Sequence, residues 1–157
     1  MPWVYIETSI VSYLRQRPSA QIIAAARQLL TRRWWEHERQ NYELVTSQYA
    51  LDEAALGDPM LATERLHALA NIPLLELPSD IPRIASEIVG RGILPPDALV
   101  DALHIAVTAF HGVEYLLTWN CKHIASAQKL PRIRDLLLEL GYAVPIVCTP
   151  EEMLGEE

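Results

Sequence analysis

The chain has 157 residues, of which 50% are hydrophobic, 21% charged and 7% aromatic. This is the length of one domain, and the apolar half suffices for a core, which excludes global disorder. The net charge of -7 excludes a protein that coats nucleic acid by bulk electrostatics. Residues 1–39 nevertheless hold six arginines against three acids. This basic segment permits local phosphate contacts, with a solvated helix face as the alternative.

Compartment signals are few. The two cysteines, Cys121 and Cys148, form neither a CxxC motif nor a zinc-binding pattern. No basic segment precedes the first apolar run, and no apolar stretch is long enough to span a membrane. We therefore expect a reducing, cytoplasmic setting and no membrane contact.

Short apolar runs alternate with helical stretches along the chain. This alternation predicts an α/β fold with a mostly parallel sheet of about five strands, covered by helices on both faces. We expect one domain over 1–150 and an acidic tail over 151–157. The predicted elements, in chain order, are a strand over 3–6, helices over 9–15 and 22–34, a strand over 43–47, helices over 47–57 and 60–70, a strand over 73–77, helices over 79–90 and 98–111, a strand over 114–118, helices over 121–128 and 131–141, and a strand over 143–147.

Some element boundaries have local signals. Apolar residues repeat every three or four positions over 22–34, which is the pattern of one face of a helix. Ser47 follows the second strand, where its side chain is suited to cap the next helix. Gly112 closes the helix over 98–111, and Pro145 suggests an edge strand near the end of the chain.

Asp101 interrupts the helix over 98–111, which is otherwise apolar nearly all round. A lone buried carboxylate costs several kcal/mol unless it is paired or binds a metal. The sequence leaves both explanations open: a structural salt bridge or hydrogen bond, and a functional role.

Three more polar residues stand near strand ends. Glu7 directly follows the first strand, and Asn120 follows the fourth, where it could simply cap a helix. Glu53 lies on the helix after the second strand, beside Asp52, and spacing does not choose between these two acids. Sites in parallel sheets form at the carboxyl ends of strands. If the three acids converge there, a divalent cation is the usual counterweight to their repulsion.

Two neighbours of Asp101 are secondary candidates. Asp97 lies four residues earlier, hence on the same helix face, and is either an extra acid at the cleft or a first-turn residue favoured by the helix dipole. His104 lies three residues later. We expect a core histidine bonded to backbone, with a metal ligand or base as the alternative.

These residues stand in motifs that resemble those of PIN domains. Tyr5-Ile6-Glu7-Thr8-Ser9 looks like the family's opening strand motif, which usually carries Asp where Glu7 stands. Asp101-Ala102-Leu103-His104-Ile105-Ala106 matches its helix motif, and Leu117-Thr118-Trp119-Asn120 resembles its fourth-strand motif, usually Thr-x-Asp. Glu53 lies where the family carries its second acid. The resemblance spans essentially the whole chain, and a chain of this size is similar to VapC-type toxins of toxin–antitoxin pairs.

The resemblance implies a three-layer α/β/α fold and a ribonuclease that depends on Mg²⁺ or Mn²⁺. In such an enzyme a metal activates the water that attacks the phosphodiester. It also implies an RNA substrate, an antitoxin partner and a homodimer. A PIN-fold module that binds without cutting is the alternative, because Glu7 and Asn120 replace the usual Asp. The implied metal-binding acids are Glu7, Glu53 and Asp101, and Asn120 completes the catalytic set. We expect Thr8, Ser9, Asp97 and Thr118 to surround this set. The basic segment adds Arg15, Arg17, Arg32 and Arg33 as expected RNA contacts.

Overall fold

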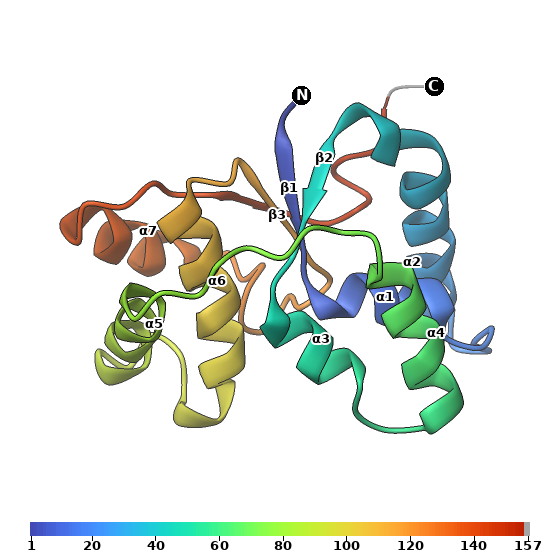
Figure 1. The fold of residues 1–157 in the computed structure, drawn as a ribbon, viewed down its shortest axis with the longest axis horizontal. Helices are drawn as coiled ribbons and strands as arrows, with labels where there is room; N and C mark the ends of the chain where they lie inside the picture. The colour runs from blue at the N-terminus through green and yellow to red at the C-terminus, as the bar shows by residue number, and fades with distance from the viewer. Residues whose placement is uncertain (156–157) are drawn as a thin grey trace.

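The computed structural model describes residues 1–155 and contains one four-stranded, all-parallel sheet. The spatial order of the strands is β2-β1-β3-β4 (Figure 1). Their bounds are β1 Trp3–Ile6, β2 Glu43–Val45, β3 Tyr115–Leu117 and β4 Ile146–Cys148. β4 is an edge strand, as Pro145 predicts, but it spans Ile146–Cys148 and not the predicted 143–147, since it begins only after the proline.

The predicted strand over 73–77 is not a strand of the sheet. It contributes only an isolated parallel bridge between Leu74 and Thr46, just beyond the end of β2. The Thr46 N–H donates to the Pro73 carbonyl at 3.0 Å, and the Leu75 N–H donates to the Thr46 carbonyl at 2.8 Å. Pro73 and Pro78 bound this segment and have no N–H to extend the ladder, so pairing stops after one bridge.

Helices cover both faces of the sheet, which confirms the three-layer α/β/α architecture (Figure 1). The segment predicted as a helix over 121–128 forms turns instead. On one face lie α1 Thr8–Arg15, α2 Ile22–Arg33, α3 Gln48–Ala54 and α4 Pro59–Leu69; on the other lie α5 Asp80–Gly90, α6 Leu99–His111 and α7 Leu130–Glu139. Short helical turns are η1 Trp34–Glu38, η2 Arg39–Asn41 and η3 Pro96–Ala98.

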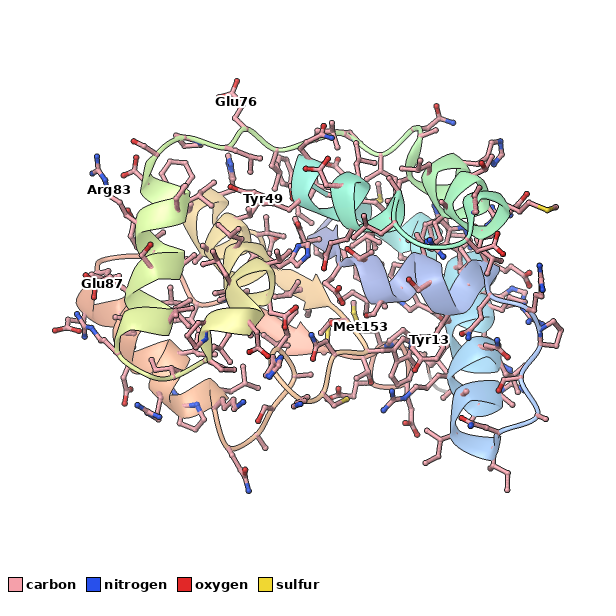
Figure 2. All side chains as sticks on the ribbon, turned by 90° about the horizontal axis from the view of Figure 1, so that it is seen from below. Tyr13, Tyr49, Glu76, Arg83, Glu87 and Met153 are labelled. Carbon is pink, nitrogen blue, oxygen red and sulfur yellow. The ribbon has the colours of Figure 1, made fainter. Side chains whose placement is uncertain are left out.

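The alternation of side chains along β1 divides the core into two clusters. Tyr5 packs with residues of α5, α6 and α7, whereas Val4 and Ile6 pack with residues of α1, α3 and α4. Figure 2 shows side chains filling the space on both sides; Tyr13 and Met153 are labelled there, and both pack against the second cluster.

The acidic tail predicted over 151–157 is described as far as Gly155, and Glu156 and Glu157 lie outside the described residues. Its first part packs on the domain, because Met153 and Leu154 are partly buried against the second cluster.

Three apolar residues of α2 are exposed to solvent. Ile22, Ile23 and Leu29 are 86%, 70% and 48% exposed, while the buried residues of this helix are Gln28 and Thr31. The apolar periodicity of residues 22–34 therefore predicts a helix, but only its last part, Leu30 and Trp34, packs against the core.

The two buried polar side chains of α2 are hydrogen-bonded. Gln28 accepts from the Ser19 N–H at 3.1 Å and donates to the Arg17 carbonyl at 2.8 Å, so it fastens the loop before the helix. The Thr31 hydroxyl accepts from the Trp119 indole N–H at 2.7 Å. These bonds explain why Gln28 and Thr31 face inward.

α6 is the central helix and carries the Asp101–His104 pair of the predicted motif. It ends at Gly112, whose φ of 64° is the left-handed conformation that glycine adopts without strain. No helix within residues 1–155 has the length and apolarity needed to cross a membrane.

Candidate metal centre

The candidate site lies where β1 and β3 end side by side. Ile6 pairs with Leu117, and the Glu7 N–H donates to the Leu117 carbonyl at 3.2 Å, so Glu7 and Thr118 leave the sheet together. The chain winds from β1 toward β2 on one side and resumes at β3 on the other. This is the switch point at which open parallel sheets bind ligands.

Glu7 is buried, with 4% of its surface exposed. Its Oε1 accepts hydrogen bonds from the Ser9 and Thr118 hydroxyls, each at 2.5 Å. Its Oε2 accepts from the Ser9 N–H at 3.1 Å, which makes Glu7 the N-cap of α1. Two hydroxyl donors and a backbone N–H thus fix the carboxylate in one orientation.

Glu53 faces the same place from α3, while its neighbour Asp52 is exposed and bonded to Gln48 at 2.9 Å. The Glu53 Oε1 accepts from the Thr8 hydroxyl and from His104 Nε2, each at 2.6 Å. Burial raises the pKa of Glu53, but the hydrogen bond and charge of His104 outweigh it, so the pKa is lowered overall.

His104 is completely buried, and its partners are side chains rather than the expected backbone groups. Its Nδ1 lies 2.6 Å from the Tyr5 hydroxyl, which lies 2.7 Å from the Ser47 hydroxyl. Ser47 precedes α3, but its side chain bonds to Tyr5 and makes no cap hydrogen bond. Burial lowers the pKa of His104, but the hydrogen bond to Glu53 and nearby carboxylates raise it more, so the pKa is raised overall.

Asp101 has a salt-bridge partner that the sequence analysis did not single out. Its Oδ2 lies 2.9 Å from His123 Nδ1, and both side chains are largely buried. The His123 N–H donates to Asn120 Oδ1 at 3.0 Å, so Asn120 caps the turn that presents His123. The Asn-x-x-His spacing after the fourth predicted strand is the signal that could have found this pair.

A divalent cation fits the donor set at this edge of the sheet. Glu7, Glu53 and His104 each offer one ligand atom, and these atoms lie within 4.8 Å of one another. Carboxylate oxygens suit Mg²⁺ and Mn²⁺, and imidazole is accepted by transition metals. In each carboxylate, one oxygen accepts from two donors, which fixes the orientation of the group. Asp101 is not in this group, because it faces His123.

Asp97 stands apart from these residues. It is exposed in η3, and no hydrogen bond or ion pair joins it to the site residues within the described chain. The expected shared helix face with Asp101 is wrong, because Asp97 lies in a 3-10 turn and α6 begins only at Leu99.

Four arginines were predicted as RNA contacts, and two of them have acidic partners. Arg15 lies 3.5 Å from Glu64, and Arg17 lies 4.0 Å from Asp58. Arg32 and Arg33 are exposed at the carboxyl end of α2.

Arg27, which the sequence analysis did not select, lies near the loop that follows β3. Its guanidinium lies 5.2 Å from the centre of the Trp119 ring and 5.7 Å from that of Tyr13. Because Trp119 precedes Asn120, this cation stands beside the site loop.

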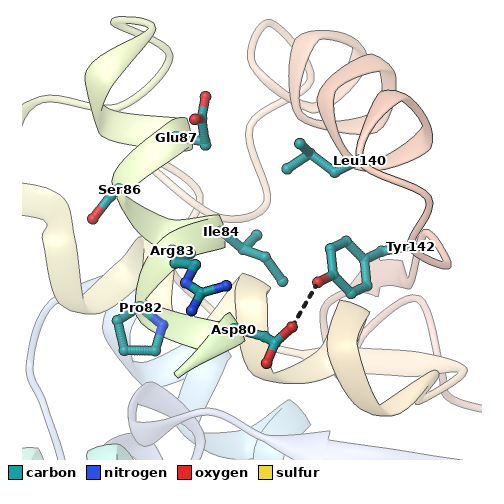
Figure 3. A pocket seen from close by; sticks show the side chains of 8 residues that line it. All are labelled: Asp80, Pro82, Arg83, Ile84, Ser86, Glu87, Leu140 and Tyr142. Carbon is teal, nitrogen blue, oxygen red and sulfur yellow. Dashed lines mark hydrogen bonds between the residues drawn. The ribbon is translucent and has the colours of Figure 1, made fainter. Parts of the chain in front are cut away.

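A pocket of about 490 Å³ lies elsewhere, between α5 and the end of α7 (Figure 3). There the Tyr142 hydroxyl donates to Asp80 at 3.4 Å. Arg83 and Glu87 also line it, and none of the site residues does. The candidate centre is therefore defined by its donor atoms and not by this pocket.

Comparison with known proteins shows the fold. A chain of the crystal structure of VapBC2 from Rickettsia felis bound to a DNA fragment from their promoter is similar to this chain, with a TM-score of 0.58 and 12% identity. The similarity covers 94% of this chain and 98% of that chain. Neither a family model nor a curated protein matches this chain.

Proposed function

We propose that this chain is a metal-dependent endoribonuclease of PIN-like fold that acts in the cytoplasm as the toxin of a toxin–antitoxin pair. The observation that carries the nuclease is the convergence of Glu7 and Glu53, each held by strong donors, at the switch point of a parallel sheet. The motif resemblance and the fold shared with a VapBC2 chain support the toxin role.

The residues of the chain have distinct parts in this proposal. Glu7 and Glu53 would hold Mg²⁺ or Mn²⁺. Asp101 would become a third ligand once its carboxylate breaks its contact with His123. When bound, the metal supplies an activated water and polarises a phosphoryl oxygen. Asn120 caps the turn that carries His123, the partner of Asp101.

The hydroxyls around the acids orient the carboxylates. Ser9 and Thr118 donate to Glu7, and Thr8 donates to Glu53. At Glu53 the hydrogen bond from Thr8 also lowers the pKa, which favours the charged form that binds metal.

The test is cleavage of a mixed pool of structured RNAs by the purified chain in EDTA, Mg²⁺ or Mn²⁺. We expect cleavage that needs the metal and falls more than about 100-fold in Glu53→Gln and in Asp101→Asn. Asp52→Asn is the matched control, because Asp52 is exposed and turned away from the site. Equal cleavage by wild type and Glu53→Gln would overturn the assignment.

A binding module without cleavage is the second candidate. Two observations favour it: Asn120 uses its carbonyl oxygen to cap a turn, and Asp101 is engaged by His123. Such a module would bind Mn²⁺ through Glu7 and Glu53 and yet leave the RNA pool intact. The same RNA pool, run beside a Mn²⁺ titration, therefore separates the two functions.

The outward apolar side of α2 supports a protein partner. Ile22, Ile23 and Leu29 form an exposed stripe that ends at Arg32 and Arg33. We propose that an antitoxin covers this stripe with an apolar segment that also carries acidic residues, since these complement the arginines.

The partner test uses co-expression with the protein encoded beside this chain's gene. We expect a stable complex, and its loss when Ile22, Ile23 and Leu29 are all changed to Gln. Light scattering of the chain alone tests whether a second copy of the chain, instead of an antitoxin, covers the stripe. We also propose a homodimer, and a dimer that the triple change converts to a monomer would assign the stripe to the second copy instead.

A further inference from the structure

The Glu53 carboxylate lies at the end of a row of hydrogen-bonded side chains. This row runs from Ser47 through Tyr5 and His104 to Glu53, with donor–acceptor distances of 2.7, 2.6 and 2.6 Å. Ser47, Tyr5 and His104 are each 0% exposed. A buried polar row of this length is stable only when every member has its partner, as these have.

Both ring nitrogens of His104 are engaged. Nε2 lies against Glu53 Oε1, and Nδ1 lies against the Tyr5 hydroxyl. The carboxylate accepts only, so Nε2 carries the hydrogen and would have to lose both this hydrogen and the bond to Glu53 before it could bind a metal. His104 therefore belongs behind Glu53 and not among the ligands.

Donors and acceptors also match along the rest of the row. When His104 Nδ1 carries no hydrogen, the Tyr5 hydroxyl donates to it and accepts from Ser47; when Nδ1 is protonated, the directions reverse. In both cases the donor to Glu53 is kept. Burial also raises the pKa of the Tyr5 phenol, so Tyr5 stays neutral and keeps its hydrogen.

The donors take up one oxygen of Glu53 and spare the other. Oε1 receives both His104 and the Thr8 hydroxyl, each at 2.6 Å. Glu53 is the member of the site that comes from the far end of a short helix, α3, and its side chain is 30% exposed. Without the row behind it, this carboxylate would lose one of its two donors and keep the hydrogen bond from Thr8.

We propose that Ser47, Tyr5 and His104 are positioning residues that lock the Glu53 carboxylate in the orientation that binds the divalent cation. The inference rests on the proposed metal centre and assigns to its buried histidine a role other than ligand. Outer partners of metal ligands are worth about 10–100-fold in metal affinity, because they fix the geometry that the cation needs.

The test is the Kd for Mn²⁺ of the full chain, measured by calorimetry on His104→Leu, His104→Gln and Tyr5→Phe. The glutamine amide nitrogen lies at about the same reach as imidazole Nε2, so it restores a donor to Glu53. We expect a Kd about 10–100-fold weaker in His104→Leu, a smaller loss in Tyr5→Phe, and rescue in His104→Gln.

Controls separate positioning from folding. Thr108→Val removes a buried hydroxyl on the same helix, one turn beyond His104, where it bonds only the Ile105 carbonyl. It should cost stability and leave the Kd unchanged. Circular dichroism at the titration temperature checks that each variant is folded, and Tyr5→Phe, which keeps the ring, serves if His104→Leu is not.

Two outcomes overturn the proposal alone. One is a wild-type Kd in folded His104→Leu or, where that variant does not fold, in Tyr5→Phe. The other is a ¹⁴N coupling of a directly bound imidazole in the pulsed EPR spectrum of the wild-type Mn²⁺ complex, which would make His104 a ligand. Absence of Mn²⁺ binding by the wild type would instead overturn the metal centre itself, and the positioning role with it.

Discussion

At the residue scale, Glu7 departs from the aspartate that the resembling motif usually carries, and its surroundings fit the longer side chain. Glu7 Oε1 meets the hydroxyls of Ser9 and Thr118, while Oε2 caps α1 through the Ser9 N–H. An aspartate would be shorter by about 1.5 Å, one C–C bond, and would not reach both sides.

We therefore expect Glu7→Asp to lower RNA cleavage about tenfold or more while leaving the thermal midpoint nearly unchanged. Aspartate is a good N-cap, so α1 keeps its cap, but the bond to Thr118 is lost. Steady-state cleavage and a thermal melt measure the two effects. Higher activity in Glu7→Asp would show that Glu7 is a compromised ligand.

At the element scale, α2 shows that the two faces of a helix must be judged by their partners. Ile22, Ile23 and Leu29 point outward, while Gln28 and Thr31 have specific inward partners, the loop after α1 and the indole of Trp119. Leaving a buried polar group without its hydrogen-bond partner costs more free energy than burying an exposed apolar side chain would gain.

This arrangement predicts that substitutions on the two sides of α2 change the free energy of unfolding by different amounts. Changing Ile23 to Gln should alter the free energy of unfolding by no more than about 0.5 kcal/mol, as for other surface positions. Changing Thr31 to Val should cost about 1–3 kcal/mol, because the Trp119 N–H is left unpaired. Urea unfolding of the two variants gives the comparison, and a larger loss for Ile23→Gln would contradict the arrangement.

At the scale of the whole molecule, the site joins the two helical layers across the carboxyl end of the sheet. Glu53 comes from α3 on one face, and His104 comes from α6 on the other. Their hydrogen bond therefore links layers that the strands otherwise separate, and its strength depends on the charges of both groups.

The shifted pKa values give this link a pH window in metal-free protein. The pKa of His104 is raised in the folded state, so its contribution is complete below the ordinary value of 6.5 and is lost as the pH rises through the folded value. The pKa of Glu53 is lowered, so its contribution is complete above 4.5 and is lost at lower pH. In EDTA, the stability difference between wild type and His104→Gln should be largest between pH 4.5 and 6.5.

Urea unfolding of the two proteins from pH 4 to pH 9 measures this difference. We expect it to shrink toward both ends of the range. A difference that stays constant from pH 5 to pH 9 would show that His104 does not become positively charged in the folded protein.

Metal should act on the same link. A cation that binds only the folded state stabilises it by about 2.7 kcal/mol at 100 times its Kd. We expect Mn²⁺ to raise the thermal midpoint of wild type, EDTA to reverse this, and Glu53→Gln to abolish it. An equal rise in Glu53→Gln would place the cation elsewhere.

The sequence by itself determined the order of most elements and the acids that are candidates for the site. Apolar periodicity, Gly112 and the residues after the first and fourth strands are local signals, so they can be read without contacts. The strand at 73–77 was predicted wrongly, because whether an apolar segment pairs depends on a free neighbour and on donors that its prolines lack.

Only the tertiary structure decided which polar groups meet. It turned Glu53 rather than Asp52 inward, gave Asp101 the partner His123, and built the row from Ser47 to His104 out of three separate elements. It also turned Gln28 and Thr31 of α2 inward. Such contacts join residues tens of positions apart, and their energy depends on burial and on saturated hydrogen bonds, which no local pattern of residues encodes.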